Sequence, residues 1–139
     1  MDYRPLKVIT TQHIDRVLEN PKWVEQVSWI KTVDQAKKAI QRMPGGKKGL
    51  VIGSGSNTTS WKSKGWQTLD IDPKFNPNYV HDANDLRNLT PRHDFILAER
   101  LEGEGTERGI SWDNFLTNAN FHLNKEGILI IDTVNQPKN

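Results

Sequence analysis

The sequence predicts an α/β fold, in which helices cover an open and mainly parallel sheet of about five strands. Short apolar runs separated by turn residues predict the strands at residues 49–52, 66–71, 78–81, 94–98 and 127–132. The first run and the last two are apolar continuously rather than alternately, which is typical of parallel strands buried on both faces. Between the last two runs, the residues whose helical spacing predicts a crossover helix are Trp112, Phe115, Leu116 and Ala119.

The second and third runs are joined by residues 73–78, whereas a parallel crossover normally needs about a dozen residues or more. The third run is therefore expected to be a short edge strand or merely extended chain. With this run at the edge, the expected strand order is 3-2-1-4-5. A ligand is expected at the carboxyl ends of the strands, near the switch in strand order.

Residues 1–44 are expected to form an N-terminal helical segment that precedes a core of residues 45–139. The Asn20-Pro21 pair predicts the start of a second helix, and a capping box of Thr32 and Gln35 predicts the start of a third. The expected apolar sides of the three helices are Ile14, Val17 and Leu18, then Trp23, Val24 and Val27, then Val33, Ala36 and Ile40.

Length and composition indicate one domain of 139 residues with a small hydrophobic core, since only 35% of the residues are hydrophobic and 26% are charged. The 19 Lys and Arg residues nearly balance the 17 Asp and Glu residues, so nucleic acid is not indicated as a partner. The chain has no cysteine, and its four histidines have no metal-ligand spacing. No run of apolar residues approaches the length of a signal core or a membrane span, so we expect a cytoplasmic protein without a membrane partner.

A glycine pair ends the first strand run, with the spacing G-x-G-x-x-T formed by Gly53, Gly55 and Thr58. Glycine there permits positive φ and lets a ligand approach the backbone, and exposed N–H groups in the following turn would favour an anionic group. An ordinary tight turn is an equally good reading of this pair alone. A dinucleotide fingerprint has glycine at the position of Thr58, which disfavours a nicotinamide oxidoreductase.

Two aspartates lie near the ends of later strand runs. Asp70 lies near the carboxyl end of the second run and is placed to accept hydrogen bonds from a ribose diol, although Asp70 and Asp72 could also cap the turn before Pro73. Asp82 follows the third run and could accept a bond from a purine amine, with the small Ala83 beside it leaving room for the ring. Asp82 could equally be a turn aspartate.

In this order, the segments "VIGSGSN", "TLDIDP", "HDANDL", "HDFILAERLEGE" and "LNKEGILIIDT" resemble the motifs of class I S-adenosylmethionine-dependent methyltransferases, over residues 49–134. The resemblance implies a Rossmann-like core and S-adenosylmethionine as cofactor. The cofactor-binding residues that it implies are Gly53, Ser54, Gly55, Ser56, Asn57, Asp70, Ile71, Asp82, Ala83 and Glu99. Within this set it places the methionine end of the cofactor at residues 53–56, the ribose at Asp70, the packing of adenine at Ile71 and its edge at Asp82 and Ala83. It also implies that "LNKEG" forms a turn at Lys125, Glu126 and Gly127. The candidates for catalysis are Glu99, Arg100 and Glu102, and Glu102 lies in a glycine-rich loop that is either a substrate gate or a solvated surface loop.

The chain departs from that family at two places. Val51 stands where the family has an acid, two residues before the first glycine. Few residues follow the fifth run, where the family adds a helix and two antiparallel strands, so the fifth strand is expected to be an edge that a partner subunit or the N-terminal helices cover. A homodimer is the first expectation. The expected function is methyl transfer to an unidentified acceptor, and the alternative is a non-catalytic binding or accessory subunit.

Overall fold

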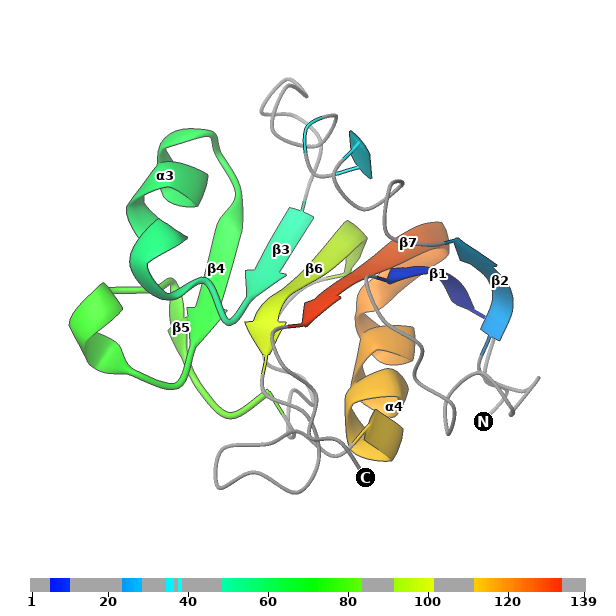
Figure 1. The fold of residues 1–139 in the computed structure, drawn as a ribbon. Helices are drawn as coiled ribbons and strands as arrows, with labels where there is room; N and C mark the ends of the chain where they lie inside the picture. The colour runs from blue at the N-terminus through cyan, green and yellow to red at the C-terminus, as the bar shows by residue number, and fades with distance from the viewer. Residues whose placement is uncertain are drawn as a thin grey trace.

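The computed structural model describes residues 6–10, 24–28, 35–36, 38, 49–83, 92–101 and 112–133. Its strands are β1 (Leu6–Thr10), β2 (Val24–Ser28), β3 (Gly49–Ile52), β4 (Gln67–Asp70), β5 (Tyr79–Val80), β6 (His93–Leu101) and β7 (Leu123–Thr133). Its helices are α3 (Thr58–Ser63) and α4 (Trp112–His122), with short 3-10 turns η1 (Gly55–Asn57) and η2 (Pro73–Phe75). The strands form one seven-stranded parallel sheet in the order β2-β1-β7-β6-β3-β4-β5 (Figure 1).

The structure confirms an α/β architecture with an open parallel sheet. The five predicted strands correspond to β3 through β7 and lie next to one another as β5-β4-β3-β6-β7. The number of strands and the order across the whole sheet differ from the prediction, because β1 and β2 extend the sheet beyond β7. β5 is a two-residue edge strand that pairs with β4, as the short connection before it indicated.

The helical prediction for residues 1–44 is wrong where the structure describes strands. Val24 and Val27, predicted on a helix face, lie in β2, which pairs in parallel with β1. Residues 35, 36 and 38 are helical, in agreement with the third predicted helix. The first predicted helix lies outside the described residues.

The fifth predicted strand, β7, is an interior strand. β1 pairs with it along Lys7 to Thr10, and β6 pairs with its other side. The chain therefore covers this edge with its own N-terminal strand, and the edge gives no reason to expect a partner subunit. The homodimer stays a prediction that sedimentation would test.

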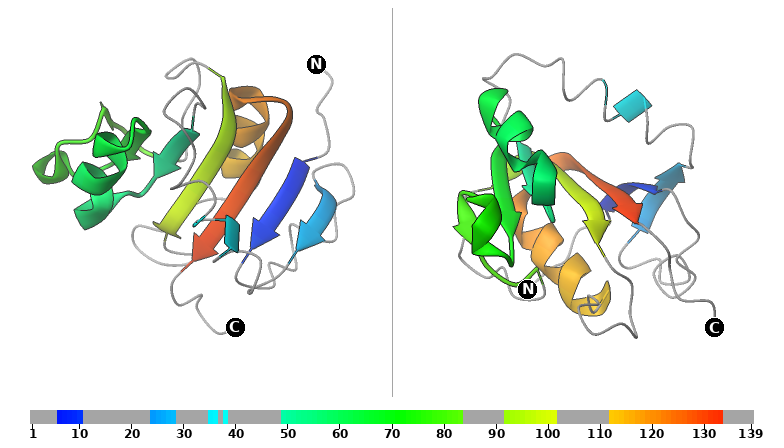
Figure 2. Two further views of the ribbon diagram at one scale, coloured as in Figure 1. Left: turned by 90° about the horizontal axis from the view of Figure 1, so that it is seen from above. Right: turned by 60° about the vertical axis from the view of Figure 1, so that its left-hand side comes forward.

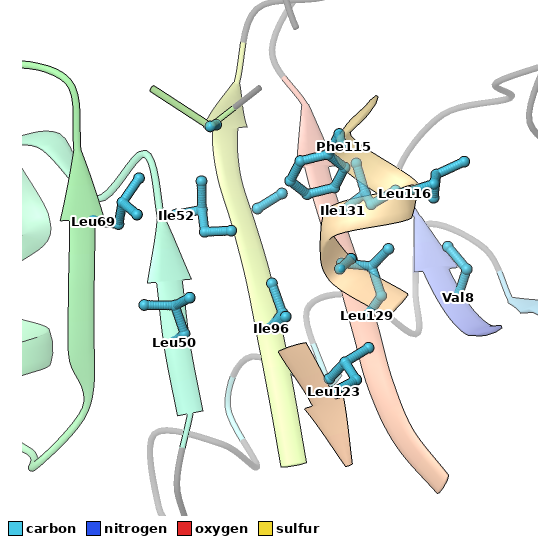
Figure 3. Close-up of a cluster of buried hydrophobic side chains, with 13 residues drawn as sticks. Val8, Leu50, Ile52, Leu69, Ile96, Phe115, Leu116, Leu123, Leu129 and Ile131 are labelled. Atoms are coloured by element: carbon cyan, nitrogen blue, oxygen red, sulfur yellow. The ribbon is translucent and has the colours of Figure 1, made fainter. Parts of the chain in front are cut away.

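Apolar side chains alternate between the two faces of the sheet and form two buried clusters. Figure 2 shows α4 on one face and the short helical segment of residues 35 and 36 on the opposite face. On the α4 side the buried residues include Leu50, Ile52, Ile96, Phe115, Leu116, Leu129 and Ile131 (Figure 3). On the other side they are Val51, Trp61, Trp66, Leu97 and Ile130. These layers fix the position of the strand ends, where the candidate site lies.

The turn predicted at residues 125–127 is a bulge inside β7. His93 of β6 pairs with Leu123 and Phe95 pairs with Ile128, so β7 has extra residues between the two pairs. A Cβ at Gly127 would lie 2.9 Å from the backbone oxygen of Asn124, which leaves room for glycine alone. No helix in the described segments is long and apolar enough to cross a membrane.

Candidate functional site

The glycine loop, which we define as residues 53–57, leaves the carboxyl end of β3 at the middle of the sheet. Because the sheet is parallel, β4 and β6 end at the same edge on either side of β3 (Figure 1). Side chains at the ends of these two strands hold the loop from both sides. The carboxyl edge at β3, β4 and β6 is therefore the candidate site.

Both glycines of the loop have backbone conformations that other residues rarely adopt. Gly53 has a φ of 77° and Gly55 a φ of 47°. A Cβ at Gly55 would meet no heavy atom within 4 Å, so the backbone conformation, rather than crowding by the protein, requires glycine there. The open space next to Gly55 lets another molecule approach the loop.

Hydroxyl groups inside the loop fix its shape. Thr58, which is buried, donates from Oγ1 to the carbonyl oxygen of Gly55 at 2.7 Å. A hydroxyl has one hydrogen, so the buried Ser54 must be the donor in its 2.6 Å contact with Oγ1 of Thr58. Thr58 at the third position of the motif thus stabilises the bend with its side chain, while Ser56 lies exposed on the surface.

Asp70 fastens the loop to the end of β4. Its Oδ2 accepts the backbone N–H of Gly55 at 2.8 Å, and its Oδ1 accepts the N–H of Asp72 at 2.9 Å. The residue is 9% exposed. A carboxylate has about four acceptor positions, so each oxygen can accept one more hydrogen bond from a ligand. Of the two roles left open by the sequence, the structure shows the bond of Asp70 to the turn that follows β4, and the binding of a ribose stays a prediction. The bond to Gly55 is a third role, in which Asp70 holds the glycine loop.

Asn57 fastens the loop to the end of β6 on the other side. Its Nδ2 donates to Oε1 of Glu99 at 2.7 Å. Asn57 is exposed, whereas Glu99 is only 2% exposed. The two strands that flank β3 therefore each contribute one carboxylate to the loop.

The backbone N–H groups of the loop are largely used within the protein, which corrects the expectation of exposed donors. Those of Gly53 and Ser54 point to the carbonyl oxygen of Leu69, at 2.8 and 3.5 Å. That of Asn57 bonds to the carbonyl oxygen of Ser54 at 2.9 Å, and that of Gly55 bonds to Asp70. The loop does not present a cluster of donors to an anion.

An acid ends three strands of this edge. Asp70 ends β4, Glu99 lies near the end of β6, and Asp132 lies near the end of β7 in register with Glu99. The sequence analysis did not single out Asp132, although an acid directly after an apolar run is the signal shared by all three. The three acids therefore lie at the same edge of the sheet as the glycine loop.

The remaining predicted cofactor residues lie around β4 and β5. Ile71, directly after Asp70, is a large apolar side chain that is 57% exposed. Asp82 is exposed, whereas Ala83 is buried in the core cluster under α4. Ile71 and Asp82 are thus accessible to a ligand, and Ala83 contributes to the core.

Of the predicted catalytic candidates, Glu99 lies in the site. The backbone of Arg100 belongs to β6, and its side chain and Glu102 lie outside the described residues. Across the described part of the chain, no three His, Asp or Glu residues form a group that could hold a metal ion.

One polar pair that holds the edge strand was missed by sequence reasoning. The side-chain oxygen of Asn78 accepts the backbone N–H of Thr68 at 2.9 Å and its hydroxyl at 3.1 Å, and the hydroxyl of Thr68 accepts the N–H of Asn78 at 3.1 Å. A single hydroxyl hydrogen on Thr68 suffices for this arrangement. These bonds hold the chain entering β5 against β4, next to Asp70.

Comparison of the chain with protein-family models, with curated proteins and with solved structures finds no match. The function is therefore inferred from the geometry of the carboxyl edge.

Proposed function

We propose that this protein binds S-adenosylmethionine at the carboxyl edge of β3, β4 and β6 and transfers its methyl group to an acceptor. The observation that carries the proposal is the direct contact between the glycine loop and Asp70, with the exposed Ile71 beside them. In this arrangement a ribose diol donates to the remaining acceptor positions of Asp70, and the base packs on Ile71. The Rossmann-like arrangement of the sheet and the order of the sequence motifs support the same ligand.

The charge of the edge distinguishes between two nucleoside cofactors. S-adenosylmethionine carries a sulfonium, an ammonium and a carboxylate group, and so a net positive charge, whereas a nicotinamide dinucleotide carries a pyrophosphate. The loop N–H groups that a pyrophosphate would need bond to Leu69, Ser54 and Asp70, and the carboxylates of Asp70 and Glu99 would repel it. The same carboxylates attract a cation.

Methyl transfer needs little from the protein beyond orientation. The acceptor's lone pair forms a bond to the methyl carbon as the bond from carbon to sulfur breaks, and the sulfur leaves as a neutral thioether. Holding the two reactants in line contributes up to about 7–11 kcal/mol in favourable cases. Glu99, Arg100 and Glu102 are the candidates for taking up a proton, where the acceptor has to lose one.

Isothermal titration calorimetry tests the cofactor. S-adenosylmethionine and S-adenosylhomocysteine should bind, and NAD should not. Asp70→Ala should weaken binding of both adenosyl ligands by about 1–3 kcal/mol, because it removes charged hydrogen bonds. An unchanged dissociation constant would remove Asp70 from the ligand site.

Val51 favours the second candidate function, a binding or accessory subunit without turnover. It stands where the resembled family has an acid, and its side chain is 2% exposed in the core cluster around Trp61 and Trp66. Formation of S-adenosylhomocysteine from S-adenosylmethionine with a panel of amine, hydroxyl and nucleic-acid acceptors separates the two functions. Binding without any product supports the accessory subunit.

A further inference from the structure

We draw no further inference here: the strongest candidate, the exposed apolar patch formed by Ile71 and Val80 where β4 and β5 end, already belongs through Ile71 to the site described above, and nothing in the described part of the chain shows what else would cover it.

Discussion

Asp70→Asn is expected to destabilise the folded protein by loosening the glycine loop. In the wild type each carboxylate oxygen accepts one backbone N–H, from Gly55 at 2.8 Å and from Asp72 at 2.9 Å. Asparagine keeps one acceptor and places an NH₂ group against the other N–H, so one charged hydrogen bond is lost and one donor is left facing a donor. The expected loss in the free energy of unfolding is about 1.5–3 kcal/mol. Asp70 is 9% exposed, so water compensates little for the lost bond.

Urea unfolding followed by circular dichroism measures this loss, with the slope of the transition showing whether unfolding stays cooperative. Asp72→Asn is the matched control two residues away. Asp72 accepts the N–H of Lys74 at 3.0 Å and lies 3.6 Å from its ammonium group, with 31% of its side chain exposed. Asparagine caps a turn as well as aspartate does, and an exposed ion pair contributes about 0–1 kcal/mol. Equal unfolding midpoints for Asp70→Asn and the wild type would refute the anchoring of the loop by Asp70.

The other predictions concern the core and the exposed apolar residue. Gly49→Ala should lower the free energy of unfolding by about 1–3 kcal/mol, because a Cβ there would overlap the ring of Trp66. Adding Trp66→Leu should cancel part of this loss in a double-mutant cycle of urea midpoints, and additive effects of the two substitutions would contradict the clash. Phe115→Ala should cost about 3–5 kcal/mol in the same assay, because the side chain is fully buried under the sheet. Ile71→Ser should change the free energy of unfolding by less than about 0.5 kcal/mol, because the side chain is exposed. The same substitution should raise the dissociation constant of S-adenosylhomocysteine several-fold in calorimetry, and unchanged binding would remove Ile71 from the base site.

The strands β3, β6 and β7 were predictable because the sheet packs against other elements on both of their faces. All four residues of β3 are buried, so the strand requires a continuous apolar run. Few other structural environments require such a run, which makes it a useful signal. The glycine loop was predictable for a related reason, since Gly53 and Gly55 both need positive φ. Local sequence alone specified these features.

The N-terminal strand β2 could not be predicted in the same way. Its two valines, Val24 and Val27, are three residues apart, a spacing that fits a helix as well as an irregular strand. What decides the conformation is pairing with β1, which in turn pairs with β7 at the other end of the described chain. Tertiary pairing overrides local periodicity in such short segments.

The positions of Asp70 and Glu99 at strand ends were predicted from the sequence, but their hydrogen bonds were not. Sequence position placed Asp70 and Glu99 at the ends of strands, but the distances between their side chains and the loop depend on the order of the strands. Because β3 lies between β4 and β6, one loop contacts both acids. The hydrogen bonds from the loop's N–H groups to the carbonyl oxygens of Leu69 and Ser54 also depend on the folded arrangement, so the sequence did not predict them.

The place of β1 in the sheet has a consequence for biosynthesis. Val8 pairs with Leu129, so on the ribosome β1 can meet β7 only after the long stretch of chain between them has emerged. Until then β2 is the strand that β1 can pair with. Pairing between strands so far apart in the sequence slows folding, because a long loop of chain must be closed before the two strands meet. While the intervening residues are being made, β1 therefore lacks this partner, and a chain that stopped before residue 128 would lack the residues of β7 that pair with it.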